Sequence, residues 1–83
     1  MLEKRVDLKK IKDLRKKKSL SIEKMSSCLG YDSPNGYFYL ESGKSKFPAE
    51  KLAKVSWILD VPIDELFFEI EITNVETFRE EVI

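Results

Sequence analysis

Residues 21–44, SIEKMSSCLGYDSPNGYFYLESGK, constrain the fold of this chain more than any other stretch. Residues 21–29 have the apolar spacing of a short helix, and Gly30 stands where a helix commonly ends in the left-handed conformation. A second helix pattern opens at Ser33-Pro34, both favourable at a helix start, and ends at Gly43. Two short helices joined by a tight turn form a helix-turn-helix unit. The sequence therefore predicts that the other segments hold this unit in place.

Length and composition indicate one small globular domain. The chain has 83 residues, of which 42% are hydrophobic, and this is enough for one core. No apolar run approaches the length of about twenty residues that a membrane span needs, and the charged start Glu3-Lys4-Arg5 is unlike a signal peptide. We therefore expect a cytoplasmic protein without a membrane segment.

The cysteine and histidine content argues against metal sites and against catalysis. Cys28 is the single cysteine, and the sequence contains no histidine. These counts leave no zinc-finger ligand set and no histidine-dependent acid–base chemistry. The absence of paired cysteines fits a reducing compartment, and no Gly-rich phosphate loop occurs. The sequence therefore predicts neither an enzyme nor a bound cofactor.

Charge is divided unevenly along the chain although its total is zero. Residues 1–46 carry twelve Lys/Arg against six Asp/Glu, a net charge of +6. Residues 47–83 carry three against nine, a net charge of −6. The basic half favours a polyanionic partner. The alternative is a charged face that only meets solvent, which small helical domains commonly have.

Three further helices are expected around the central unit. Helical spacing predicts helices over residues 7–17 and 48–59, and a short fifth helix begins at Ile63. Residues 68–72 alternate apolar and acidic side chains as a strand does, and residues 73–82 again follow helical spacing. We thus expect an all-α, compact five-helix bundle with a short C-terminal strand or helix tail. Because a lone strand is unstable, residues 68–72 either pair with a second copy or stay extended coil.

Five short motifs follow one another between residues 7 and 68. They are Ile11-x-x-Leu14-Arg15, Leu20-Ser21-Ile22-Glu23-x-Met25-Ser26-x-x-Leu29-Gly30, Leu40-Glu41-Ser42-Gly43-Lys44, Leu52-Ala53-Lys54-Val55 and Leu59-Asp60-Val61-Pro62-Ile63-Asp64-Glu65-Leu66-Phe67. This ordered set resembles the Cro/cI-type (XRE-like) helix-turn-helix domain of phage and bacterial transcriptional regulators. The resemblance implies a lambda-repressor-like DNA-binding domain over residues 1–68. Residues 69–83 then form an acidic C-terminal tail, a candidate dimerisation element.

The resemblance also implies a role for individual residues. In that family the second helix of the motif lies in the major groove with its N-terminal residues at base edges, so the recognition helix here would span about residues 33–42. Asn35 is the strongest base reader, because its amide can pair with adenine N6 and N7. The implied base contacts are Ser33, Pro34, Asn35, Phe38 and Tyr39, and the implied phosphate contacts are Lys17, Lys18, Ser21, Ser42, Lys44 and Lys46. Arg15 and Glu41 would form a structural ion pair. The alternative for residues 33–36 is cap and turn chemistry alone.

Two functions remain open from the sequence. The first is a sequence-specific, repressor-like transcriptional regulator that binds double-stranded DNA as a homodimer. Its expected dimer interface consists of Trp57, Ile58, Phe68, Ile70 and Ile72. The alternative for Trp57 is a half-buried cover on the tail of its own chain. The second function is a protein-interaction module with the same fold, weak or no DNA binding and a regulatory protein partner, which the zero net charge and the Phe38-Tyr39 pair favour.

Overall fold

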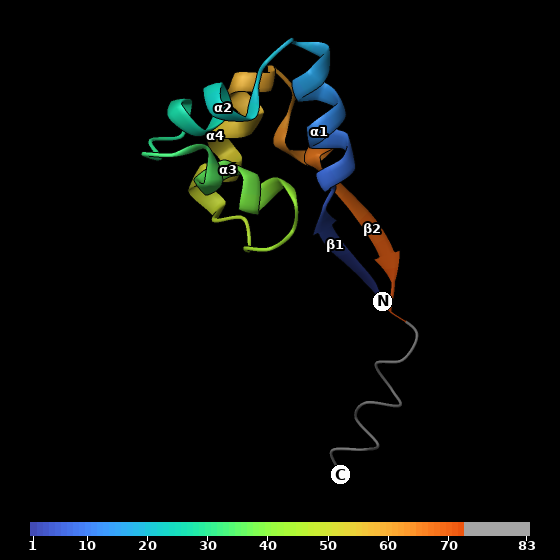
Figure 1. Ribbon diagram of the computed structural model, residues 1–83. Helices are drawn as coiled ribbons and strands as arrows, with labels where there is room; N and C mark the ends of the chain where they lie inside the picture. The colour runs from blue at the N-terminus through green and yellow to red at the C-terminus, as the bar shows by residue number, and fades with distance from the viewer. Residues whose placement is uncertain (73–83) are drawn as a thin grey trace.

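Four α-helices are joined to a two-stranded antiparallel ribbon in the computed structural model, which describes residues 1–72 (Figure 1). The elements in chain order are β1 (Leu2–Val6), α1 (Leu8–Lys17), α2 (Ile22–Cys28), α3 (Pro34–Glu41), α4 (Ala49–Leu59), the 3-10 turn η1 (Ile63–Leu66) and β2 (Phe67–Glu71). The four predicted α-helices are thus confirmed, with bounds close to those that the spacing indicates.

The prediction of an all-α, five-helix bundle is wrong. The expected fifth helix is the four-residue 3-10 turn η1, because Pro62 fixes extended backbone before it and Phe67 is already extended after it. The strand expected over residues 68–72 forms as β2, but it pairs within its own chain rather than with a second copy. Its partner is β1, a strand that the sequence reading did not predict.

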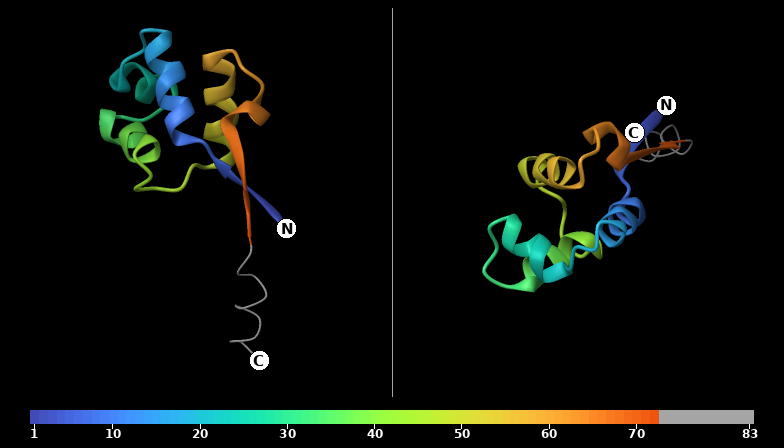
Figure 2. Two further views of the ribbon diagram at one scale, coloured as in Figure 1. Left: turned by 90° about the vertical axis from the view of Figure 1, so that its right-hand side faces the viewer. Right: turned by 90° about the horizontal axis from the view of Figure 1, so that it is seen from above.

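The ribbon joins the two ends of the described chain. β1 and β2 are antiparallel, with Val6 opposite Phe67 and Lys4 opposite Glu69. At its base, the backbone N–H of Asp7 donates to the carbonyl oxygen of Leu66 over 2.7 Å, which ties the start of α1 to η1. Figures 1 and 2 show the ribbon projecting away from the helices, and the principal extents of 47 × 23 × 18 Å reflect this projection.

A single apolar core lies among the helices. Seen from above in Figure 2, α1, the α2–α3 pair and α4 surround it from three sides. Its buried members are Ile11, Met25, Leu29, Tyr37, Leu52, Val55, Leu59 and Leu66. From α3, Tyr37 and Leu40 are both buried. The core therefore fixes which side of α3 remains available to a partner.

Two further expectations concern the C-terminal tail and the presence of a membrane-spanning helix. Residues 73–82, for which the sequence predicts helical spacing, and most of the acidic tail lie outside the described residues. Within residues 1–72, no helix has the length and apolar character needed to cross a membrane.

Candidate nucleic-acid interface

A left-handed glycine ends α2, as the sequence predicts. Gly30 has φ +88°, its N–H donates to the carbonyl of Ser27 over 3.0 Å, and the N–H of Tyr31 donates to the carbonyl of Ser26 over 3.0 Å. This pair of bonds is a Schellman motif, which satisfies carbonyls that the helix end would otherwise leave open. The chain consequently leaves α2 in a fixed direction before it enters α3.

Lys51 of α4 closes the same turn from the other side. Its Nζ donates to the carbonyl oxygen of Leu29 over 2.6 Å and lies 4.9 Å from the centre of the Tyr31 ring. A cation at a helix C-terminus is favoured by the helix dipole, and a cation over an aromatic face is favoured by the ring quadrupole. Lys51 thus holds the turn against α4 through two contacts.

Gly36 lets the first turn of α3 approach the Tyr31 ring. A Cβ atom added at Gly36 would lie 2.3 Å from Cγ of Tyr31, which is closer than real side chains approach. The glycine therefore does more than lower the helix propensity of α3, because it makes room for an aromatic ring beside the helix. The turn and α3 pack as one unit through this contact.

Ser26 connects α2 to the start of α3. Its buried hydroxyl donates to the carbonyl of Ser33 over 2.5 Å and accepts from the backbone N–H of Tyr37 over 3.2 Å. The predicted cap by the side chain of Ser33 is wrong, since that side chain makes no capping hydrogen bond, whereas Pro34 does occupy the first turn. Ser26 supplies from α2 a hydrogen bond that satisfies one of the free N–H groups of α3.

One side of α3 is free of contacts with the core. Ser33, Pro34 and Asn35 are exposed at its N-terminal end, and the aromatic residues Phe38 and Tyr39 follow. Phe38 is 48% exposed, and its ring centre lies 6.0 Å from that of Tyr39 in a tilted arrangement. The five residues predicted to face bases are therefore all exposed, from Ser33 just before α3 to Tyr39 in its second half, and they present an amide, a hydroxyl and two aromatic rings.

Cationic and hydroxyl side chains stand at both ends of the helix-turn-helix unit. Lys17 and Lys18 are exposed at the end of α1, and Lys44 and Lys46 are exposed in the loop after α3. Nζ of Lys44 lies 5.2 Å from the centre of the Tyr39 ring, so this lysine stays beside the exposed part of α3. The four lysines are thus exposed cations, a residue type that contacts phosphates in nucleic-acid interfaces.

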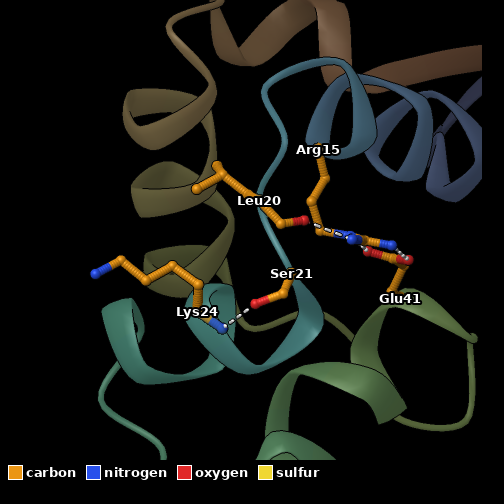
Figure 3. Close-up of polar contacts among 5 residues, drawn as sticks. All are labelled: Arg15, Leu20, Ser21, Lys24 and Glu41. Atoms are coloured by element: carbon orange, nitrogen blue, oxygen red, sulfur yellow. Dashed lines mark hydrogen bonds and ion pairs between the residues drawn. The ribbon is translucent and has the colours of Figure 1, made fainter.

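Two hydroxyl groups complete the predicted phosphate contacts. Ser21 caps α2, because its Oγ accepts from the N–H of Lys24 over 3.0 Å (Figure 3). Its own hydroxyl proton remains available to a phosphate. Ser42 is exposed at the end of α3, where its hydroxyl donates to the carbonyl oxygen of Tyr39 over 3.3 Å.

Arg15 and Glu41 form a buried ion pair behind α3. Nε and Nη2 of Arg15 donate to the two carboxylate oxygens of Glu41 over 2.8 and 3.0 Å, and Nη1 donates to the carbonyl of Leu20 over 2.6 Å (Figure 3). The bonds to Glu41 raise the pKa of Arg15 above its ordinary value, against the opposing effect of burial. The pair that the resemblance implies is thus present, and it fixes the end of α3 to α1.

Tyr37 lies beside this pair with its hydroxyl group buried. The hydroxyl makes no hydrogen bond with any residue of the described chain. Burial raises the pKa of Tyr37 above its ordinary value, and the neighbouring carboxylate of Glu41 adds to the shift, because both oppose a negative charge on the phenol. Tyr37 is therefore a neutral core residue and takes no part in an exposed site.

The residues predicted for a dimer interface lie on two separate elements. On α4, Trp57 is 80% exposed, so no residue in the range 1–72 covers it, whereas Ile58 is half-buried against the core. On β2 and just after it, Phe68 is exposed and Ile70 and Ile72 are half-buried. The structure therefore does not gather these five residues into one surface.

Sequence reasoning missed several residues that position α3. Neither Ser26 nor Lys51 is among the residues that the sequence predicts to position this helix. Gly36 carried a signal that could have revealed its role, because a glycine inside a helix pattern commonly marks a close approach of another group. The contact of Lys51 with the carbonyl of Leu29 has no comparable local signal, since the two residues are 22 positions apart.

Comparisons of this chain with protein-family models, with curated proteins and with solved structures return no match.

Proposed function

We propose that this chain is a sequence-specific DNA-binding regulator of transcription, repressor-like and homodimeric, that places α3 in the major groove. The observation that carries the proposal is the exposed N-terminal half of α3, which presents Asn35 while hidden contacts from Ser26 and Tyr31 hold it rigid. A rigid helix with an amide at its exposed end suits direct reading of base edges. The resemblance to the Cro/cI-type domain supports the same reading.

Charge supports a nucleic-acid partner. Residues 1–46, which include α1, α2, α3 and the loop to Lys46, hold a net charge of +6. The exposed lysines at the end of α1 and in the loop after α3 flank the helix that would enter the groove. In this arrangement the lysines set affinity and orientation, and the α3 residues set sequence preference.

A protein-interaction module is the alternative, and one observation favours it. Phe38 and Tyr39 form an exposed aromatic pair on α3, and aromatic side chains are common anchors in protein interfaces. In this case α3 would bind a regulatory protein partner rather than DNA.

A salt titration of binding to random duplex DNA separates the two functions. A DNA binder loses affinity steeply as salt rises, because phosphate contacts release counterions. We expect the logarithm of the association constant to fall linearly with the logarithm of the salt concentration. Absence of binding to any duplex at low salt would overturn the DNA-binding proposal and leave the interaction module.

A further inference from the structure

Trp57 is the most exposed large apolar side chain of the helices, and a groove adjoins it. The groove has a volume of about 560 Å³ and is lined by Ala53, Ser56, Trp57, Asp60, Val61 and Pro62. Tryptophan is one of the residue types enriched among binding hot spots, together with tyrosine and arginine. This part of α4 therefore has both a projecting ring and a recess.

A projection and a recess side by side form a self-complementary surface. A two-fold symmetric contact uses the same patch on both subunits, so each subunit must offer what the other needs. If two α4 helices cross antiparallel with their Trp57 residues at the axis, each indole lies over the groove of the other copy. We propose that α4 is the homodimer interface, in which each Trp57 inserts into the groove of the second copy beside Val61 and Pro62.

Charge on the same patch is complementary in this arrangement. With Trp57 opposite Trp57 of the second copy, Lys54 lies three residues before the axis and Asp60 lies three residues after it. Lys54 of each copy then faces Asp60 of the other. Both are exposed, and neither forms an ion pair with any residue among positions 1–72. Asp60 also lies beside the groove, where its carboxylate could accept the indole N–H.

The inference deepens the homodimer part of the proposed function and rests on it. It separates Trp57 from Phe68, Ile70 and Ile72, which lie in β2 and just after it, because the ribbon projects away from the helices (Figures 1 and 2). Ile58 supports the interface from behind, through its contact with the core.

Trp57 is the only tryptophan of the sequence, so its fluorescence reports on this surface without any label. We expect the emission of the full chain, free of DNA, to shift to shorter wavelength as protein concentration rises. Quenching by acrylamide should weaken over the same concentration range, and sedimentation should show the mass doubling with the same midpoint. A chain that stays monomeric, or a dimer whose tryptophan is quenched as in the monomer, would overturn the inference.

Variants test the same surface independently. Trp57→Ala should weaken the dimer by about 30-fold or more, as expected for a central hot spot. Phe68→Ser removes an exposed aromatic ring from the ribbon and should leave the dimer midpoint unchanged. The reverse pattern, with loss of the dimer only in Phe68→Ser, would place the interface on the ribbon and contradict the proposal. Circular dichroism and melting of each variant establish that it folds.

A charge change gives a sharper test of the predicted facing residues. Lys54→Glu places two carboxylates opposite each other and should weaken the dimer by about five- to tenfold. Adding Asp60→Asn, which keeps a residue type that tolerates the left-handed backbone at this position, should restore part of that loss. Additive effects of the two changes would show that they do not face each other.

Binding of random duplex DNA, measured separately, keeps the two proposals distinguishable. A dimer with a buried Trp57 and no affinity for DNA would contradict the DNA-binding function and leave the interface intact. A monomer that binds DNA would do the reverse.

Discussion

The buried hydroxyl of Ser26 in α2 accepts a hydrogen bond from the backbone N–H of Tyr37 in α3, over 3.2 Å. The same hydroxyl donates to the carbonyl of Ser33, immediately before α3 begins. One side chain of α2 therefore positions the start of α3. The orientation of the exposed α3 residues depends on this contact, although Ser26 itself is hidden from any partner.

Ser26→Ala should lower stability without exposing the core. Its loss leaves the buried N–H of Tyr37 without a partner, whereas the carbonyl of Ser33 still accepts from the N–H of Gly36, and an unsatisfied buried N–H costs about 1–3 kcal/mol. Ser27→Ala is a matched control, because Ser27 is exposed on the next position of the same helix. Urea unfolding of both variants checks the prediction, and equal midpoints would show that the hydroxyl of Ser26 contributes nothing.

Gly36→Ala should destabilise the protein although alanine favours helix by about 1 kcal/mol over glycine. The added methyl group would meet the Tyr31 ring at 2.3 Å, so the ring or the turn must move. Such overpacking costs about 1–3 kcal/mol. In a Tyr31→Ala background the same change should become neutral or stabilising. A double-mutant cycle measured by thermal unfolding tests this, and additivity would exclude the steric contact.

Glu41→Ala should strongly lower the stability of the folded chain. It leaves the buried guanidinium of Arg15 without its carboxylate, and removing one partner of a buried pair costs about 3–5 kcal/mol. Asp13→Ala breaks the exposed pair with Lys9 and should leave the unfolding midpoint unchanged. Unaltered melting of the Glu41 variant would show that the ion pair is absent in solution.

Stability should fall in alkaline solution because of Tyr37. Its pKa is raised in the folded chain, so above a pH of about 10 the unfolded chain releases a proton that the folded chain keeps. The contribution is complete below that pH and is lost as pH rises, by about 1.4 kcal/mol per unit. The Tyr37→Phe variant should be as stable as the parent chain at neutral pH. Between about pH 8 and 11 its free energy of unfolding should fall less than that of the parent chain. Parallel losses in both proteins would contradict the assignment.

Asn35→Ala and Lys44→Ala should affect DNA binding in different ways. If Asn35 reads a base, its removal costs about 1–3 kcal/mol at one base pair and relaxes the preference there. Lys44→Ala should instead weaken all sequences alike and reduce the salt slope by about one. Binding to a selected site and to random duplex separates the two patterns. Equal losses on both DNAs for Asn35→Ala would remove it from the base contacts.

The local part of this structure could be predicted from sequence because its signals are local. Ser21 caps α2 through a residue three positions away, and Gly30 ends α2 through its own backbone conformation. Pro34 begins α3 for a similar reason. Each of these positions depends on the covalent neighbourhood, which the sequence displays directly.

The rest could not be predicted because it depends on pairing between distant residues. β1 is almost entirely exposed and carries three charges in five residues, so it lacks the apolar alternation of a half-buried strand. β1 is extended because it pairs with β2, and the two strands are separated by most of the sequence. Likewise, the sequence predicts that Ser33 caps α3. In the structure the hydroxyl of Ser26 accepts from an N–H of α3 instead, and this bond requires that α2 and α3 have packed together.

Because β1 pairs with β2, the ribbon can form only near the end of synthesis of the described residues. Val6 leaves the ribosome 61 residues before its partner Phe67, a delay of about 3–12 s at ordinary rates of translation. The helices depend mainly on contacts between near neighbours and can assemble during this interval, because closing short loops costs little entropy. β1 waits as a single strand with open hydrogen-bonding groups until β2 emerges. Its run Glu3-Lys4-Arg5 then serves a second purpose, since charged side chains discourage a waiting strand from pairing with another nascent chain.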